Sequence, residues 1–144
     1  MDKRSRFRNV VNSEQIPGEQ WGREIERFGI ISREAAVAVG ARDLGYCLVS
    51  VDPGKRSGPY HFHHSEEEVF FVLSGRGRLR QGDAEGEEEI EIGPGDFASF
   101  PAGTPFFAFF DSSWAFVCVS DICATSSAWR CESEPLPFDG ESGC

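Results

Sequence analysis

Two features of the 144-residue sequence predict an all-β protein. Short apolar or alternating segments are separated by turns rich in glycine and proline, at roughly the 8–12-residue spacing of a β-sandwich or barrel. No long segment has the periodicity of an amphipathic helix. We predict an antiparallel β-barrel, since closure protects strand edges that an open sheet of this size would expose.

The predicted strands follow one another from residue 44 onward. Residues 44–51 are apolar with β-branched members, and Asp52-Pro53-Gly54 forms a turn after them. Residues 69–73 form a continuous apolar run, too short for a typical helix, which predicts a strand buried on both faces. Turns are expected at residues 82–83 and 93–96, and the remaining strands at residues 60–63, 77–81, 87–92, 97–100, 105–110 and 114–120.

Residues 32–39 are ambiguous between helix and extended structure. Ala35, Ala36 and Ala38 favour a short helix, whereas Val37 and Val39 favour an extended edge segment. Because the segment is short, we predict extended structure.

The chain length fits one domain. We expect a flexible N-terminal tail over residues 1–20 and a single barrel domain over residues 21–123. The segment 124–144 is rich in Ser, Pro, Glu and Gly, so we expect it to be irregular.

Charge and cysteine content exclude several classes of function. The formal net charge of −10 repels nucleic-acid backbones and anionic membranes. No apolar run approaches the ~20 residues of a membrane helix, and no signal-peptide core follows the basic N-terminus. The five cysteines are odd in number and form no Cys-x-x-Cys pair, so we expect a reduced cytoplasmic protein.

All three histidines lie within four positions, at His61, His63 and His64. Alternate strand residues face the same side, so His61 and His63 converge on one point in the interior, while His64 points away. Acidic residues 66–68 follow at once. Two imidazoles and one carboxylate bind a divalent transition metal and leave coordination positions open for a ligand. The competing interpretation is a solvated surface turn.

The segment 58–77 resembles the first conserved motif of the cupin superfamily, in which His-x-His is followed by Glu and then Gly. By this resemblance Glu68 is the matching acid, since it stands seven residues before Gly75. The resemblance implies a cupin barrel, that is, a double-stranded β-helix or jelly roll. It also implies that His61, His63 and Glu68 are metal ligands for Fe, Mn, Ni or Zn.

Residues 95–103 match the frame of the second cupin motif, Gly-x5-Pro-x-Gly, but the expected histidine is missing. Its position holds Phe106, so three motif ligands remain where the family has four. Two interpretations stay open: a retained metal site of lower affinity, or a lost metal site in a barrel that binds an organic molecule.

Phenylalanines crowd the predicted strand at 105–110. If Phe106 takes the place of an inward histidine, Phe110 faces inward too, because it stands four positions further along the same strand. Phe70 stands two positions after Glu68 and therefore faces the same side as that residue. We therefore predict that Phe70, Phe106 and Phe110 line a substrate pocket, with ordinary barrel core as the alternative. Arg76, Arg78 and Arg80 also share one face, and a solvated stripe is favoured over an anion site.

The leading hypothesis is a metal-dependent cupin enzyme acting on a small organic molecule, of oxygenase or isomerase/cyclase type. The alternative is a non-enzymatic sensor or accessory protein with a partial or lost metal site. No catalytic acid or base is assigned, and the substrate is open. Homodimerisation is expected by resemblance alone.

Overall fold

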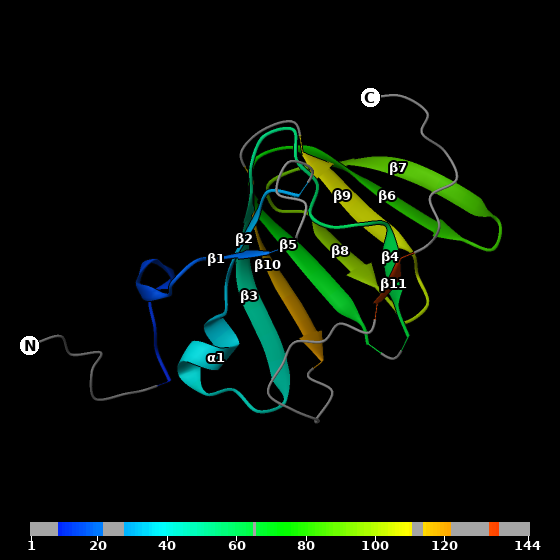
Figure 1. The fold of residues 1–144 in the computed structure, drawn as a ribbon. Coiled ribbons are helices and arrows are strands. Elements are labelled where there is room, and N and C mark those ends of the chain that lie inside the picture. Colours follow the sequence, from blue (N-terminus) through cyan, green and yellow to red (C-terminus); the bar gives the residue numbers. More distant parts are fainter. Residues whose placement is uncertain (1–8, 22–27, 65, 111–113, 122–132, 136–144) are drawn as a thin grey trace, which may run out of the picture.

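The computed structural model describes residues 9–21, 28–64, 66–110, 114–121 and 133–135 (Figure 1). Its strands form two antiparallel sheets that face each other. The elements in chain order are a 3-10 helix at Ser13–Gln15, β1 (Glu19–Trp21), β2 (Ile30–Arg33), α1 (Ala35–Val39), β3 (Leu44–Val51), β4 (His61–His63), β5 (Glu68–Ser74), β6 (Gly77–Asp83), β7 (Gly86–Ile92), β8 (Phe97–Phe100), β9 (Phe106–Phe110), β10 (Trp114–Asp121) and β11 (Ser133–Pro135).

Strand pairing is nested about the β6–β7 hairpin. β6 pairs with β7, β5 with β8, β4 with β9 and β3 with β10, all antiparallel. The first sheet has the order β1-β2-β3-β10-β5-β8, and the second has β11-β4-β9-β6-β7. This pairing is that of a jelly roll, so the predicted all-β fold is confirmed.

The core lies between the two sheets. Val49, Val51, Phe70, Val72 and Phe100 come from the first sheet, and Leu79, Ile92, Phe106 and Ala108 come from the second. Each of these side chains is at most 9% exposed. The alternation of apolar residues along the strands therefore sets which face of each strand points inward.

The prediction of extended structure over residues 32–39 is wrong beyond Arg33, because Ala35–Val39 form the helix α1. Ala36 is 2% exposed, so the helix buries one small side chain. Gly40 adopts a left-handed conformation (φ 71°), and its N–H donates to the carbonyls of Ala36 and Val37. A glycine cap and alanine-rich composition together outweigh the two valines.

The turn predicted at Gly82-Asp83 is also wrong, since β6 continues through both residues. The Asp83 carboxylate accepts hydrogen bonds from the N–H groups of Glu85 and Gly86, at 2.7 and 3.1 Å. The aspartate therefore fixes the turn just after the strand instead of lying in it.

The ends of the chain contribute two short strands. β1 begins at Glu19, two residues before the predicted domain start, and β11 lies within the segment expected to be irregular. β11 pairs with β4 over residues 133–135. Among the described residues, no helix combines the length and the hydropathy that crossing a bilayer requires.

Candidate metal centre

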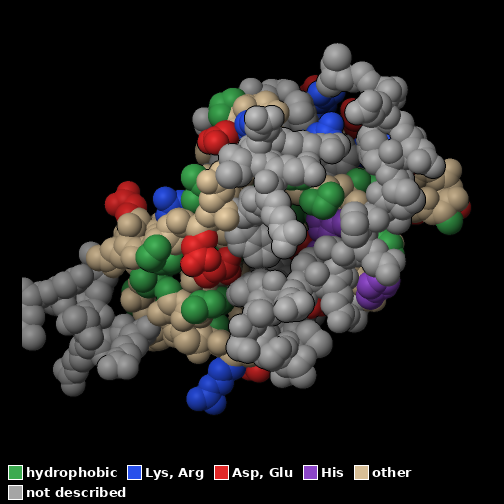
Figure 2. All heavy atoms as spheres, in the orientation of Figure 1, with side chains coloured by type: hydrophobic (Ala, Val, Ile, Leu, Met, Phe, Trp, Pro, Cys, Tyr) green, Lys and Arg blue, Asp and Glu red, His purple; other side chains and the backbone are tan. Residues whose placement is uncertain are grey.

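Two neighbouring elements bring together the imidazoles and the carboxylate. His61 and His63 occupy alternate positions of β4, and Glu68 opens β5 in the opposite sheet. One ligand atom from each of the three residues lies within 4.8 Å of the other two. Histidine atoms are visible at the surface in the region of β4 (Figure 2). Strand alternation brings His61 and His63 to the same face of β4, and the facing of the two sheets brings Glu68 to them.

β4 is held in place by a few specific backbone contacts. His61 pairs with Phe106 of β9, and the N–H of Ser57 donates to the Ala108 carbonyl at 3.0 Å. The N–H of Gly103 donates to the His63 carbonyl at 2.8 Å. Gly103 has φ 85°, a conformation that favours glycine, which explains the final glycine of the second motif.

The His61 ring is oriented by the backbone. Its Nδ1 lies 2.7 Å from the Pro59 carbonyl oxygen, which can only accept, so Nδ1 carries the proton. The lone pair of Nε2 is then available to a metal ion. Burial lowers the pKa of His61 below its ordinary value of 6.5, and the Pro59 contact opposes that shift only in part. A neutral imidazole at neutral pH is the form that binds metals.

His63 is 7% exposed and connects two carboxylates. Its Nε2 lies 2.7 Å from Glu68 Oε2, and its Nδ1 lies 4.0 Å from Glu66 Oε2. A metal ion would take the place of the proton between His63 and Glu68, while Glu66 would face the opposite ring nitrogen. At 4.0 Å the Glu66 carboxylate is too far for a hydrogen bond to His63, but its charge lies near the ring nitrogen opposite Glu68.

Phe106 lies against both imidazoles. Its ring centroid is 4.8 Å from that of His61 and 6.1 Å from that of His63. It is 1% exposed and stacks on Phe100 with centroids 3.8 Å apart and an interplanar angle of 9°. The residue where a fourth ligand is expected thus forms an apolar wall beside the three potential ligands.

The other predicted site residues are placed as follows. Phe70 is 4% exposed and packs edge-on against Phe100 and Phe106, behind the imidazoles. The side chain of Phe110 lies outside the described residues. His64 is exposed with its ring against Phe62, and the Glu67 carboxylate accepts from the Ser99 hydroxyl.

The arginines of β6 lie on the outer face of their sheet, opposite the buried Leu79. Arg78 pairs with Glu89 at 3.6 Å, and Arg80 Nε donates to Glu87 at 2.9 Å. Burial, followed by the charge and hydrogen bond of Glu87, raises the pKa of the neighbouring Tyr60 to about 12. The stripe therefore balances the acidic strand β7, as the favoured interpretation predicts.

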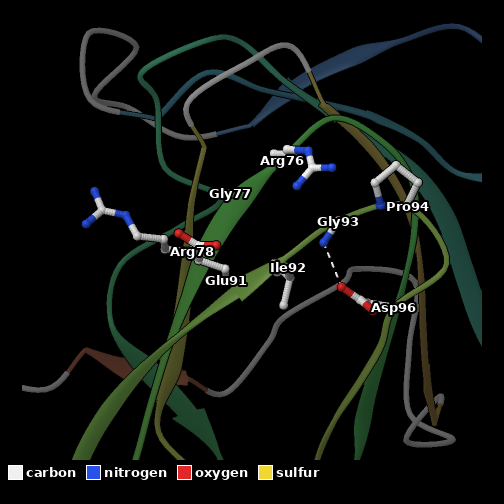
Figure 3. Close-up of a pocket in the computed structure, with 8 residues that line it drawn as sticks. All are labelled: Arg76, Gly77, Arg78, Glu91, Ile92, Gly93, Pro94 and Asp96. Atoms are coloured by element: carbon white, nitrogen blue, oxygen red, sulfur yellow. Dashed lines mark hydrogen bonds between the residues drawn. The ribbon is translucent and has the colours of Figure 1, made fainter.

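A separate hollow of about 510 Å³ lies where β6 and β7 meet their neighbouring turns (Figure 3). None of the three potential metal ligands lines it. Arg76, Arg78, Glu91 and Asp96 give it a mixed charge, and Asp96 accepts from the Gly93 N–H at 2.7 Å. Among the described residues, the group of side chains that could hold a metal ion is His61, His63 and Glu68, which lie outside this hollow.

Two contacts of this site could not be predicted from the sequence. The Pro59 carbonyl has no sequence signal, because any residue has a carbonyl. Glu66 stands in the acidic run, but only the path of the β4–β5 turn shows that it approaches His63.

The metal-free protein is expected to lose stability as the pH falls below 6.5. His61 titrates below 6.5 when folded and at about 6.5 when unfolded, so the unfolded state binds the extra proton first. The stabilising contribution of neutral His61 is therefore present above 6.5 and is lost as the pH falls through its folded pKa. Urea unfolding of chelator-treated protein between about pH 5 and 8 measures this slope.

His61→Gln should flatten that slope, whereas the exposed His64→Gln should leave it unchanged. Equal slopes in wild type and His61→Gln would contradict the prediction.

The sequence and the structure were compared with known proteins. The cupin domain profile matches residues 47–119, just over half of the 144-residue chain. A search of curated proteins found no match. The matched segment contains both histidines, Glu68 and the second-motif frame.

Solved structures share the fold. A putative sugar phosphate isomerase from Acidithiobacillus ferrooxidans is 27% identical, with a TM-score of 0.67 over 79% of this chain and 75% of that chain. A cupin-superfamily sugar phosphate isomerase from Silicibacter pomeroyi is 28% identical, with a TM-score of 0.63 over 78% and 74%.

A predicted oxalate decarboxylase from Thermotoga maritima has the same TM-score of 0.63, over 78% of this chain and 97% of that one. At 19% identity it supports the fold alone. The jelly-roll pairing, the two motifs and the matching profile agree, and the chain belongs to the cupin family.

Proposed function

We propose that this protein is a metal-dependent cupin enzyme acting on a small organic substrate, with His61, His63 and Glu68 as the metal ligands. The observation that carries the proposal is the convergence of two imidazole nitrogens and one carboxylate oxygen within 4.8 Å. These donors suit Fe(II), Mn(II), Ni(II) or Zn(II), and three protein ligands leave positions open for a substrate.

The surroundings of the three donors fit a metal ion. The Pro59 carbonyl fixes the proton of His61 on Nδ1, and Glu66 faces Nδ1 of His63. The Nε2 atom of His61 is thereby left without a proton, and Nε2 of His63 lies 2.7 Å from the Glu68 carboxylate. A bound ion would act as a Lewis acid on a carbonyl or hydroxyl oxygen. Phe106 and Phe100 would keep water from one side of that point.

Isomerisation is the reaction class that we favour. The two relatives at 27% and 28% identity are described as sugar phosphate isomerases, and Lewis-acid polarisation next to a carbonyl serves such chemistry. An oxygenase would use the same three ligands. Activity that requires a redox-active metal would distinguish an oxygenase from an isomerase.

A second candidate is a non-enzymatic protein that binds a small molecule, with a partial metal site. Two observations favour it. Phe106 removes the fourth ligand position, and the 2.7 Å contact between His63 and Glu68 satisfies these two groups without a metal ion.

We also propose that the protein forms a homodimer and is cytoplasmic, as the sequence analysis expects. An apolar strip on the outer face of the first sheet supports self-association. Phe97 is 74% exposed and lies 4.4 Å from the Phe71 ring, and Leu73 is 46% exposed. Apolar rings so exposed often mark contact surfaces.

Metal analysis of the untagged protein tests the proposed function. Purified wild type should hold close to one equivalent of a transition metal, and His61→Ala should lose it. His64→Ala is the matched control, since His64 is an exposed histidine next to β4 that faces away from the site. It should retain the metal.

Thermal unfolding of all three proteins confirms that they are folded. A wild type that stays metal-free after incubation with each of the four metals would contradict the proposal and favour the second candidate. Equal metal content in wild type and His61→Ala would contradict the assigned ligands.

A further inference from the structure

Two cysteines occupy directly opposite positions in neighbouring strands of the first sheet. β3 and β10 run side by side (Figure 1) and pair in unbroken antiparallel register over Leu44–Val51 and Trp114–Asp121. This register sets Cys118 opposite Cys47. The pairing of the two strand backbones therefore fixes where the two cysteines stand relative to each other.

The spacing of opposed residues suits a disulfide bond. In an antiparallel pair, the Cα atoms of directly opposite residues lie about 4.5 Å or about 5.5 Å apart, depending on whether the pair is hydrogen-bonded. Disulfide bonds in proteins join residues whose Cα atoms are about 4.4–6.8 Å apart. Register partners also lie on the same face of their sheet. A bond between Cys47 and Cys118 therefore fits the strand pairing as it stands.

Cys47 lies on the inner face of β3 and is partly open to solvent. It alternates with the buried Val49 and Val51 and packs against the core cluster to which they belong. It is half-buried and carries a free thiol in the structure. A half-buried thiol is within reach of a small reagent, whereas a thiol enclosed in the core is not.

β3 and β10 form the outermost pair of the nested strand pairing. The pairs β4 with β9, β5 with β8 and β6 with β7 all lie between them in the chain. A bond from Cys47 to Cys118 would enclose residues 48–117 in a covalent loop, which holds all three potential metal ligands. Because the stabilisation from a disulfide grows with the length of the loop that it closes, a bond at this position has a large effect on unfolding.

From this register we propose that Cys47 and Cys118 form a reversible disulfide bond that joins β3 to β10 under oxidising conditions. The oxidant would be a small disulfide such as oxidised glutathione. The Cys47 thiolate attacks one sulfur and releases a first glutathione thiolate, and the Cys118 thiolate then attacks the Cys47 sulfur of the mixed disulfide and releases the second. The protons lost by the two cysteines pass to the two glutathione thiolates, so one small disulfide is reduced as the pair is oxidised.

Such a bond agrees with the cytoplasmic location proposed above. Disulfide bonds in the cytosol are usually transient or redox-sensing, because the glutathione pool keeps thiols reduced until it is itself oxidised. The bond would stabilise the fold under those conditions and open again when reducing conditions return. The inference does not depend on the proposed function, since neither cysteine belongs to the group of potential metal ligands.

Peptide mapping of the oxidised wild type tests the proposal. The folded full-length protein is incubated with a chelator and excess oxidised glutathione, the remaining thiols are blocked with N-ethylmaleimide, and the chain is cleaved before each aspartate. This cleavage releases residues 43–51 and 111–120, each with one cysteine, and separates them from the other three cysteines. The two peptides should appear as one linked species in mass spectra, and dithiothreitol should separate them.

Thermal unfolding measures the effect of the bond. Oxidation should raise the unfolding midpoint of the wild type by about 10 °C, and dithiothreitol should reverse the rise. Cys47→Ala and Cys118→Ala should lose this shift. Cys131→Ala is the matched control, because residue 131 belongs to neither β3 nor β10, and it should keep the shift.

Two results of the mapping would overturn the proposal: peptides 43–51 and 111–120 that stay separate after oxidation of the folded protein, or a link between them that forms only in urea. Because the mapping uses the wild type, poor folding of a variant cannot imitate either result. A link that forms in the folded protein and leaves the unfolding midpoint unchanged would refute the stabilising role of the bond.

Discussion

Phe106→His is expected to strengthen binding of Zn(II) or Mn(II) about 100-fold while destabilising the metal-free protein. Structural zinc sites with four ligands bind with about 10–16 kcal/mol, or about 3 kcal/mol for each ligand, which corresponds to roughly 100-fold in affinity. The Phe106 ring lies 4.8 and 6.1 Å from the rings of His61 and His63, so an imidazole there reaches the same point.

The loss of stability in the metal-free Phe106→His variant has a different cause. Phe106 is 1% exposed and stacked on Phe100, so a histidine there buries polar nitrogens in an apolar contact. We expect a cost of about 1–3 kcal/mol, recovered when metal binds.

Competition titrations with a chromophoric chelator measure the affinity, and urea unfolding with and without metal measures the stability. Phe106→Leu is the matched control, since it loses the ring and adds no ligand. It should share the destabilisation without gaining affinity. Equal metal affinities in Phe106→His and wild type would show that a side chain at position 106 does not reach the metal site.

Phe100→Ala is expected to destabilise the protein by about 3–5 kcal/mol, as for other buried phenylalanines. Phe100 is 1% exposed, stacks on Phe106 and lies 5.2 Å from the Phe70 ring. It also pairs with Glu68 across β8 and β5. The substitution opens a cavity directly behind the site, so metal affinity should fall along with stability.

Phe97→Ala provides the comparison on the same strand. Phe97 is 74% exposed and contacts Phe71 on the outer face, so its loss should cost about 0.5 kcal/mol. Urea unfolding of both variants by circular dichroism gives the two values. Comparable losses would mean that the core is not centred on the Phe100–Phe106 stack.

Much of the fold was predictable because its signals are local. Short strands punctuated by turns identify β3 to β10, and the bounds of β3 and β8 agree exactly with the predicted ranges. The errors arose where a single residue decides the conformation. A left-handed Gly40 ends a helix that two valines argue against, and the Asp83 carboxylate moves a turn by two residues.

For the site, alternation along one strand was sufficient to select His61 and His63 and to exclude His64. The metal role of these residues and of Glu68 stays a prediction, as does the pocket role of Phe70 and Phe106. What the sequence could not provide is cross-strand register. Only pairing of β9 with β4 and β6 reveals that Phe106 lies between His61 and Gln81.

The three potential ligands come from opposite sheets, with the histidines on β4 and the glutamate on β5. An ion held by them is therefore a cross-link between the two halves of the molecule. The free energy of unfolding then rises as the site fills with metal. The rise is about 2.7 kcal/mol when the free metal concentration exceeds the dissociation constant 100-fold. For a small domain of ordinary stability this is a substantial share of the total, so metal supply would regulate the protein's lifetime as well as its chemistry.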